Sequence, residues 1–179
     1  MIQRERYINN IKPFIGKDIV KVLTGIRRSG KSVMLRLIQE EIQRQGVVET
    51  QFISFNFESM ENADFCTASS LYQELKRRIA LIQGKVYLFF DEIQEVEQWE
   101  KCINSARVDF DCDIYITGSN AKLLSGELAS YLGGRYVEFV VFPFSFEEYL
   151  ESIKQENKDT SVTEEFKNYL EMGGMPFLV

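Results

Sequence analysis

The sequence contains the pattern G-x-x-x-x-G-K-S in the stretch Gly25-Ile26-Arg27-Arg28-Ser29-Gly30-Lys31-Ser32, which is the strongest indication of its fold. An apolar, β-branched run at residues 19–23 precedes it, and residues 32–45 after it carry apolar side chains at helical spacing. A strand, a glycine loop and a helix in this order form a P-loop, in which backbone N–H groups and the helix N-terminus face phosphates. The alternative, a chance turn before an ordinary helix, does not explain the preceding strand. We therefore predict a nucleoside triphosphate site.

The chemistry of the pattern assigns roles to its side chains. Lys31 is expected to reach the terminal phosphates, and the Ser32 hydroxyl is expected to bind Mg²⁺. Arg27 and Arg28 either add positive charge for phosphate or point outward to solvent or a partner. The residues that we predict to contact the nucleotide are Gly25, Ile26, Arg27, Arg28, Ser29, Gly30, Lys31, Ser32 and Val33.

A second signal is the continuous apolar run at residues 86–90, which ends in Asp91 and Glu92. Such a run is typical of a parallel strand that is covered on both faces, and ligands bind at the carboxyl ends of these strands. Asp91 is expected to face the Mg²⁺ site, and Glu92 to take a proton from water that attacks the γ-phosphate. The alternative is a pair of solubilising carboxylates.

Two weaker signals follow. The strand at residues 113–117 ends in Gly118, Ser119 and Asn120, whose polar groups could orient the attacking water or simply form a turn. Arg135 follows a predicted helix at 121–132 and a glycine pair. It could act as an arginine finger on the nucleotide of a neighbouring subunit, or form a surface ion pair.

Composition limits the classes of function. The chain has 179 residues, 45% of them hydrophobic, which fits one folded α/β domain, and its net charge of −6 gives no general attraction to nucleic acid. It contains no histidine, which excludes Ser-His-Asp and Cys-His catalysis, and three cysteines without a C-x-x-C pair, expected to be reduced. No apolar run is long enough to span a membrane and no signal peptide is recognisable, so we expect a cytoplasmic protein without membrane contact.

The order of elements predicts an α/β fold, because strands that alternate with helices form a parallel sheet with helices on both faces. We divide the chain into an N-terminal helix at 1–15 without an indicated function, a P-loop ATPase core at 16–153, and a linker with the start of a C-terminal region at 154–179. Residues 58–66 are predicted to form a loop. The glycine pair near the end looks like the start of another element, so we expect a longer protein.

Several motifs together resemble the AAA+ P-loop ATPases of the additional-strand, catalytic-glutamate division. The resemblance is closest to a prokaryotic branch of uncharacterised ATP-binding proteins related to archaeal and signalling-type ATPases. The stretches that carry it are Leu23–Ser32, Leu88–Gln94, Thr117–Ser119, Gly134-Arg135 and Pro143–Tyr149. The resemblance implies a three-layer P-loop NTPase fold with a five-stranded parallel sheet in the order 5-1-4-3-2.

The same resemblance implies roles for individual residues. Asp91 corresponds to the Walker B aspartate, Glu92 to the catalytic glutamate, and Ser119, with Asn120 as its competitor, to the first sensor. Arg135 falls at a finger-like position. Relatives continue into a C-terminal region, so a lid and a second-sensor arginine are expected outside this chain. That region could contact protein or nucleic acid, and a homo-oligomer is possible.

We therefore interpret the chain as a Mg²⁺-dependent ATPase module that hydrolyses ATP by water attack. The first alternative is a nucleotide-dependent switch with negligible turnover that acts through a C-terminal partner domain. The second is a small-metabolite kinase, for which we identify no acceptor pocket. The preference for adenine over guanine follows from the family resemblance alone.

Overall fold

A computed structural model describes residues 2–119, 130, 132–155 and 161–176 of the chain. Its centre is a five-stranded sheet in which every pair of neighbouring strands is parallel, in the order β2-β3-β4-β1-β5. Read from the other edge, this is the predicted order 5-1-4-3-2. The strands are β1 (Val20–Gly25), β2 (Phe52–Asn56), β3 (Val86–Asp91), β4 (Cys112–Ser119) and β5 (Tyr136–Val140).

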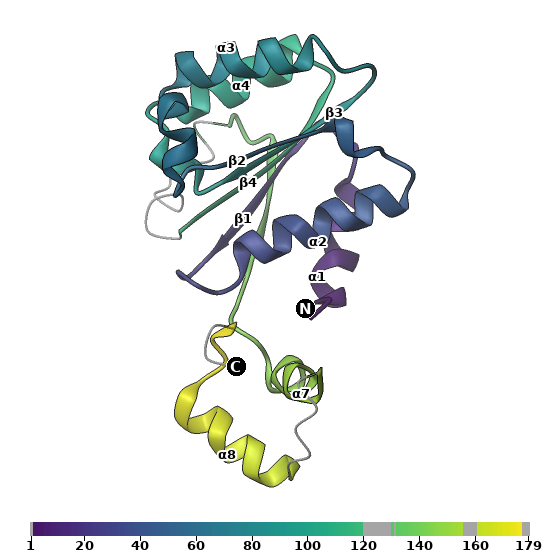
Figure 1. The fold of residues 1–179 in the computed structure, drawn as a ribbon, viewed down its shortest axis with the longest axis vertical. Helices are drawn as coiled ribbons and strands as arrows, with labels where there is room; N and C mark the ends of the chain where they lie inside the picture. The colour runs from purple at the N-terminus through teal and green to yellow at the C-terminus, as the bar shows by residue number, and fades with distance from the viewer. Residues whose placement is uncertain (1, 120–129, 131, 156–160, 177–179) are drawn as a thin grey trace.

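Helices cover both faces of this sheet and make the predicted three layers (Figure 1). On one face, α1 (Glu5–Ile11) and α2 (Lys31–Arg44) pack through Ile11, Met34 and Ile38 onto strand residues such as Leu23 and Phe89. On the other face lie α3 (Ala68–Ile79) and α4 (Trp99–Asp109). Because both faces are covered, β1 and β3 are buried along their whole length. The unbroken apolar run of β3 indicates this, whereas β1 is buried although it contains Lys21.

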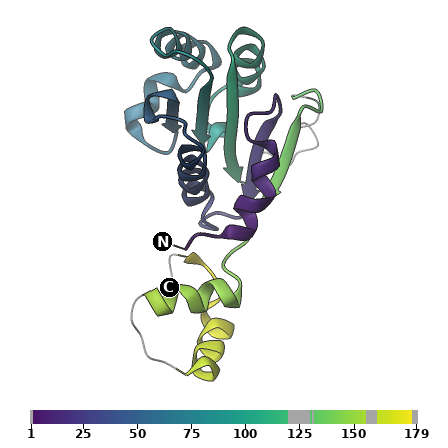
Figure 2. The same cartoon turned by 90° about the vertical axis from the view of Figure 1, so that its right-hand side faces the viewer.

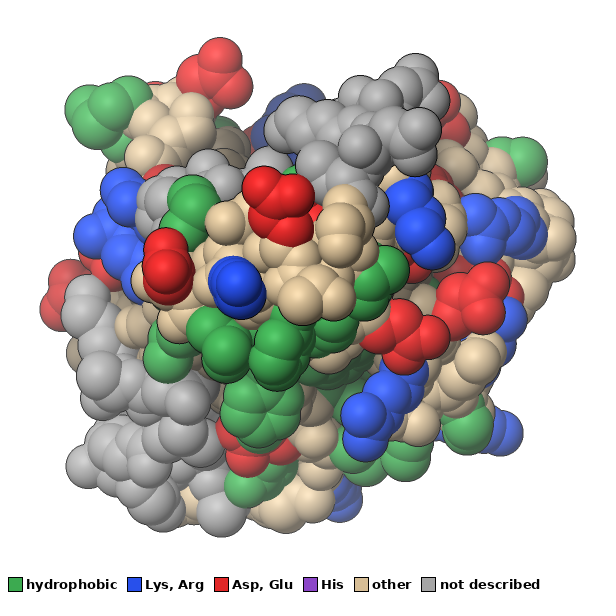
Figure 3. Space-filling model, turned by 90° about the horizontal axis from the view of Figure 1, so that it is seen from below, with side chains coloured by type: hydrophobic (Ala, Val, Ile, Leu, Met, Phe, Trp, Pro, Cys, Tyr) green, Lys and Arg blue, Asp and Glu red, His purple; other side chains and the backbone are tan. Residues whose placement is uncertain are grey.

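Two further helices, α7 (Phe146–Gln155) and α8 (Val162–Met172), follow the sheet and lie beyond the end of β5 (Figures 1 and 2). They pack on each other through an aromatic cluster of Phe146, Tyr149, Phe166 and Tyr169. A capping box begins α7, because Ser145 and Glu148 exchange backbone-to-side-chain hydrogen bonds. Apolar side chains gather on the surface of this end of the molecule, seen from below (Figure 3).

Residues 174–176, which follow α8, contact the segment between β5 and α7 and the P-loop. The Phe144 backbone N–H donates to the Gly174 carbonyl at 2.6 Å. A Cβ at Gly174 would lie 2.1 Å from the Phe144 carbonyl oxygen, so only glycine fits at this approach. Pro176 then lies 3.8 Å from the position of a Cβ at Gly30. Residues 174–176 therefore reach the P-loop.

Local structure differs from the sequence prediction in two places. Short 3₁₀ helices occupy Lys12–Phe14, Glu49–Gln51, Met60–Phe65 and Ile93–Glu95. The segment at 58–66, predicted as an irregular loop, is thus largely helical, with Ser59 accepting a hydrogen bond from the Glu61 backbone. The N-terminal helix ends at Ile11, because Pro13 begins a tighter turn. The predicted helix at 121–132, except for Ser130 and Leu132, lies outside the described residues. So does most of the linker at 154–160, while Lys154 and Gln155 belong to α7.

Candidate functional site

The P-loop lies at the carboxyl edge of the sheet, where β1 ends at Gly25 and α2 begins at Lys31. A Cβ at Gly25 would lie 2.3 Å from the Val141 carbonyl oxygen, so the loop approaches the chain after β5 too closely for a side chain. Gly30 caps α2 with a φ of 98°, in the left-handed region. The two glycines therefore allow the turn from strand to helix that the pattern predicts.

Lys31 points back across this loop. It is 4% exposed, and its Nζ lies 3.3 Å from the carbonyl oxygens of both Gly25 and Ile26. The same Nζ lies 3.4 Å from Glu92 Oε1. All three contacts are long for hydrogen bonds of an ammonium group, which prefers 2.7–2.9 Å to oxygen anions. The lysine is thus held loosely, at the position where incoming phosphate oxygens could replace its partners.

Most other polar side chains of the loop face solvent, whereas Ser29 is 0% exposed. Arg27 is 82% exposed at its side chain and lies 3.5 Å from Glu58 Oε1, so it points outward, the second of the two orientations considered for it. Arg28 is exposed and has a φ of 67°. Ser32 is exposed in the first turn of α2. Its hydroxyl is open to a ligand from outside.

Asp91 and Glu92 lie beside Lys31 at the end of β3. Asp91 is 7% exposed and accepts a hydrogen bond from the Thr117 hydroxyl at the end of β4. The same Thr117 oxygen accepts from the Glu92 backbone N–H at 2.9 Å. Glu92 has a left-handed backbone, with φ 53° and ψ 52°, which turns its side chain toward Lys31. The structure thus brings together Lys31, Asp91 and Glu92, as the motifs predict.

Gln94 holds the second oxygen of the Glu92 carboxylate. Its Nε2 donates to Glu92 Oε2 at 2.5 Å, while its own Oε1 is buried and has no hydrogen-bond partner among the described residues. Sequence reasoning leaves this glutamine unassigned and does not single out Thr117 from the polar stretch that contains it. The only available signal was their closeness to Asp91 and Ser119, which does not distinguish a functional side chain from turn chemistry.

The remaining predicted residues lie in different parts of the structure. Ser119 pairs with Gly25 across β4 and β1, so it lies beside the first P-loop residue. Asn120 lies outside the described residues. Arg135 precedes β5, and its carbonyl accepts from the Val20 N–H at the start of β1. Because the strands are parallel, Arg135 lies at their amino ends, whereas Lys31 of the same chain lies at their carboxyl ends. A role toward a second copy stays a prediction.

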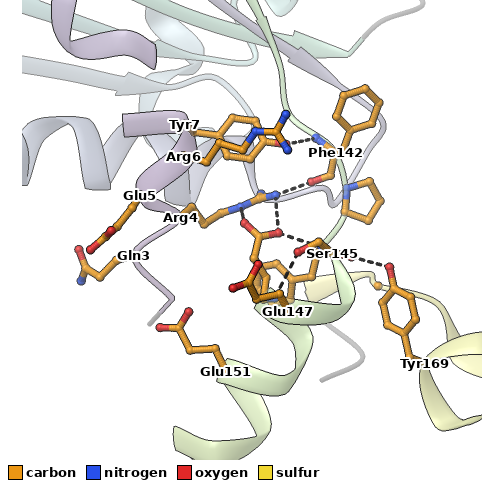
Figure 4. Close-up of a pocket in the computed structure, with 14 residues that line it drawn as sticks. Gln3, Arg4, Glu5, Arg6, Tyr7, Phe142, Ser145, Glu147, Glu151 and Tyr169 are labelled. Atoms are coloured by element: carbon orange, nitrogen blue, oxygen red, sulfur yellow. Dashed lines mark hydrogen bonds and ion pairs between the residues drawn. The ribbon is translucent and has the colours of Figure 1, made fainter. Parts of the chain in front are cut away.

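An arginine near the N-terminus, which sequence reasoning also missed, contacts the P-loop. Arg4 is 4% exposed and has a left-handed backbone, with φ 47°. Its guanidinium donates to the Ser29 carbonyl at 3.1 Å, to the Phe142 carbonyl at 2.7 Å and to both oxygens of Glu148 on α7. Figure 4 shows Arg4 pointing to Phe142 and α7 at the edge of a cavity of about 1080 Å³. One side chain thus joins the N-terminus, the P-loop and α7.

A second ion pair between a lysine and a carboxylate lies at the amino ends of the strands, opposite the P-loop. The side chains of Lys21 on β1 and Asp113 on β4 are fully buried and form an ion pair. Lys21 also donates to the Lys17 carbonyl at 3.0 Å, and Asp113 accepts from the Gly16 N–H at 2.7 Å and the Tyr115 hydroxyl at 2.8 Å. Burial lowers the pKa of Lys21 and outweighs the opposing effect of Asp113. This cluster satisfies its own polar groups and has no opening for a ligand.

The oxygen groups at the P-loop suit a hard cation bound together with phosphate. Asp91 offers a carboxylate and Ser32 an exposed hydroxyl, which are oxygen ligands of the kind that Mg²⁺ takes. Over the part of the chain that the structure describes, no group of three or more His, Cys, Asp or Glu side chains could hold a metal ion. Protein groups alone do not form a complete cage, whereas Mg²⁺ commonly binds to one or two carboxylates plus substrate phosphates.

Two curated relatives cover most or all of this chain. An uncharacterised protein of Haemophilus influenzae is 42% identical over 179 residues, which are 100% of this chain and 45% of that protein. An uncharacterised protein of Methanocaldococcus jannaschii is 32% identical over 165 residues, or 88% of this chain and 35% of that protein. The chain therefore spans less than half the length of these two relatives. No described helix is both long and apolar enough to cross a membrane.

Solved structures share the fold. The Orc1 protein of Aeropyrum pernix, solved in complex with DNA, matches with a TM-score of 0.64 over 88% of this chain and 50% of that chain. Its sequence identity is 13%, so the match concerns the fold alone. The sequence itself decides the family, because residues 17–150 match the model of a family described as AAA domain. Together with the parallel sheet and its P-loop, this match shows that the chain belongs to this AAA domain family of AAA+ P-loop proteins.

Proposed function

We propose that this AAA domain binds ATP with Mg²⁺ and hydrolyses it by attack of water on the γ-phosphate. The observation that carries the proposal is the contact of Lys31 Nζ with Glu92 Oε1 at 3.4 Å, with Asp91 beside them. The contact supports the proposal because an ammonium group is suited to bind phosphate and a carboxylate is suited to accept a proton from water.

Each side chain has a distinct part in this reaction. Lys31 exchanges its long carbonyl contacts for phosphate oxygens, which frees Glu92 to accept the proton of the attacking water. Asp91 and Ser32 hold Mg²⁺, whose charge offsets that of the phosphates when it is bound. Ser119, beside Gly25, and Asn120 are proposed to contact the γ-phosphate or the water.

Binding and turnover in three proteins test this function. The native chain is expected to hydrolyse ATP only with Mg²⁺, Lys31→Ala to lose nucleotide binding, and Glu92→Gln to bind ATP without turnover. Matched controls are Lys76→Ala and Glu49→Gln, which remove exposed charges on α3 and before β2. Both controls should behave as the native chain does. A folded native chain that binds no nucleotide would refute the proposal, and competition with GTP measures the preference for adenine.

A second candidate function is a nucleotide-dependent switch with negligible turnover. The Arg4 network favours it, because the same guanidinium contacts the P-loop at Ser29 and α7 at Glu148. Nucleotide binding that displaces the loop would therefore reach α7 and α8. Hydrogen exchange with and without ATP on Glu92→Gln tests this, since protection should change in both helices. Unchanged exchange there, with bound nucleotide, would exclude the switch.

Partners of the longer protein are part of the proposal. A homo-oligomer would allow Arg135 to act on the nucleotide of a neighbouring copy, so turnover per chain should rise with protein concentration and fall in Arg135→Ala. Contact with nucleic acid is suggested by the Aeropyrum pernix Orc1 protein, which was solved with DNA. The net charge of −6 requires any such contact to be local.

A further inference from the structure

The hydroxyl of Thr117 is shared between the two carboxylate residues of the site. Thr117 is fully buried, its Oγ1 donates to Asp91 Oδ1, and it accepts from the Glu92 backbone N–H at 2.9 Å. A threonine hydroxyl has one proton to donate and lone pairs to accept with. The donor is therefore committed to Asp91 and an acceptor position to Glu92. Asp91, the last residue of β3, and Glu92, which follows it, thus depend on one oxygen atom.

Strand register accounts for this placement. β3 and β4 are parallel neighbours, with Phe90 opposite Ile116, and the next step along both strands brings Asp91 beside Thr117. Directly after this point the backbone of Glu92 turns into the left-handed region. Such a conformation is costly for a residue other than glycine and persists only when its surroundings hold it. The hydrogen bond from Glu92 N–H to Thr117 supplies such a hold.

The turn has a direct consequence for the reacting groups. It directs the Glu92 side chain across the site, where Oε1 lies 3.4 Å from Lys31 Nζ and Oε2 accepts from Gln94. The bond from Thr117 to Asp91 Oδ1 meanwhile leaves the other Asp91 oxygen for a ligand. Thr117 itself is 0% exposed, so its hydroxyl acts on these neighbours and not on the substrate.

We propose that Thr117 is a positioning residue that sets the orientation of Asp91 and Glu92 together, so that the metal-binding and proton-accepting carboxylates are aligned by a single hydroxyl. This inference rests on the proposed ATP hydrolysis. It differs from the roles predicted for Ser119 and Asn120, which concern direct contact with phosphate or water. Groups that orient metal ligands or catalytic side chains in this way commonly change activity by 10- to 100-fold when removed.

Thr117→Val tests the proposal, because valine keeps the branched shape and removes only the hydroxyl. We expect kcat to fall by about 10- to 100-fold while KM for ATP stays within about threefold, since Lys31 and the loop are intact. The Mg²⁺ concentration for half-maximal rate should rise several-fold because Asp91 loses its fixed orientation. Thr117→Ser retains the hydroxyl and should keep both values near those of the native chain.

Thr24→Val is the matched control, because Thr24 is also fully buried and its hydroxyl donates to Glu138 at 2.6 Å, away from both carboxylates. It should lose stability without the change in Mg²⁺ dependence. Equal losses in Thr117→Ser and Thr117→Val would overturn the proposal, because the methyl group would then be what matters. If valine prevents folding, Thr117→Ala takes its place, because Thr117→Ala and Thr117→Ser differ only in the hydroxyl, and equal kcat in these two variants would overturn the proposal.

The same assays separate this inference from the proposed function. Lys31→Ala and the native chain are measured in parallel. If the native chain shows no turnover, the ATPase proposal fails and the role of Thr117 in it fails too. If the native chain turns over ATP and Thr117→Val matches it in kcat and Mg²⁺ dependence, only the inference about Thr117 is wrong.

Discussion

Two lysines are buried among the described residues, Lys21 on β1 and Lys31 at the start of α2. They lie at opposite ends of the strands and differ in how they are held. The Lys21 pair with Asp113 has 0% exposed side chains and further hydrogen bonds to the Lys17 carbonyl, the Gly16 N–H and the Tyr115 hydroxyl. Lys31 has contacts of 3.3–3.4 Å only, to two loop carbonyls and to Glu92. Both are ion pairs of lysine with a carboxylate, but only the second has partners that a ligand can replace.

The two lysines illustrate how a charged side chain that stabilises the fold differs from one that binds a ligand. A buried ion pair is stable only when hydrogen bonds satisfy its remaining donors and acceptors. The Lys21 cluster meets that condition inside the protein, so its removal should affect folding. The contacts of Lys31 meet this condition poorly, so removal of the Lys31 side chain should affect ligand binding.

The largest expected effect separates the two lysines by stability. Lys21→Met leaves Asp113 buried without its cation and should lower the free energy of unfolding by about 3–5 kcal/mol. Lys31→Met should lower it by less than about 1 kcal/mol, because its contacts are long and Glu92 keeps Gln94. Urea denaturation of both variants measures the difference. The double variant Lys21→Met/Asp113→Leu should recover much of the loss, and equal losses in the two single variants would contradict the comparison.

A smaller effect concerns affinity at the Lys31 site. Glu92→Gln removes the carboxylate that holds Lys31 and repels phosphate, so ADP should bind more tightly, by about fivefold or about 1 kcal/mol. Titration calorimetry measures this directly. Gln94→Leu is the control, because it frees one Glu92 oxygen and retains the charge, and its affinity should change less. Weaker ADP binding in Glu92→Gln would show that the pair does not compete with the nucleotide.

The smallest effect extends the comparison to Glu74 on α3, whose carboxylate pairs with two arginines. Arg77 and Arg78 both donate to Glu74 and lower its pKa to about 2. Because the folded pKa lies below the ordinary value of 4.5, the stabilisation is present above about pH 4.5 and is lost as pH falls toward 2. The melting temperature of Glu74→Gln should therefore lie slightly below that of the native chain at pH 6, and the gap should narrow on acidification. A gap that widened would reverse the assigned sign.

Short sequence patterns were sufficient to predict those parts of the site whose residues are close together in the chain. The P-loop between β1 and α2 follows from glycine spacing beside a strand and a helix, and the position of Asp91 and Glu92 follows from a buried run that ends in charge. The strand order was a consequence of the family resemblance, because nothing in residues 112–119 reveals that β4 lies between β1 and β3.

Contacts between distant segments were not predictable in this way. Thr117 reaches Glu92 across 25 residues, and Lys21 reaches Asp113 across 92 residues. In the sequence Lys21 interrupts an apolar strand as a solvent-facing residue would, whereas packing buries it together with its partner. The place of Arg135 was not predictable either, because the direction of the parallel strands puts it at the end of the sheet opposite Lys31 of the same chain. Its role toward a neighbouring copy stays a prediction.

The Arg4 network also bears on the order in which the chain is made. Arg4 and its counter-ion Glu148 are separated by 144 residues, so they are among the first and the last residues of the described structure to be synthesised. Until Glu148 has left the ribosome, the arginine beneath Ser29 has no carboxylate to pair with. The P-loop residues are thus translated early, and their support from α7 is completed late. A site that reads as one short motif is finished only when nearly the whole domain has emerged.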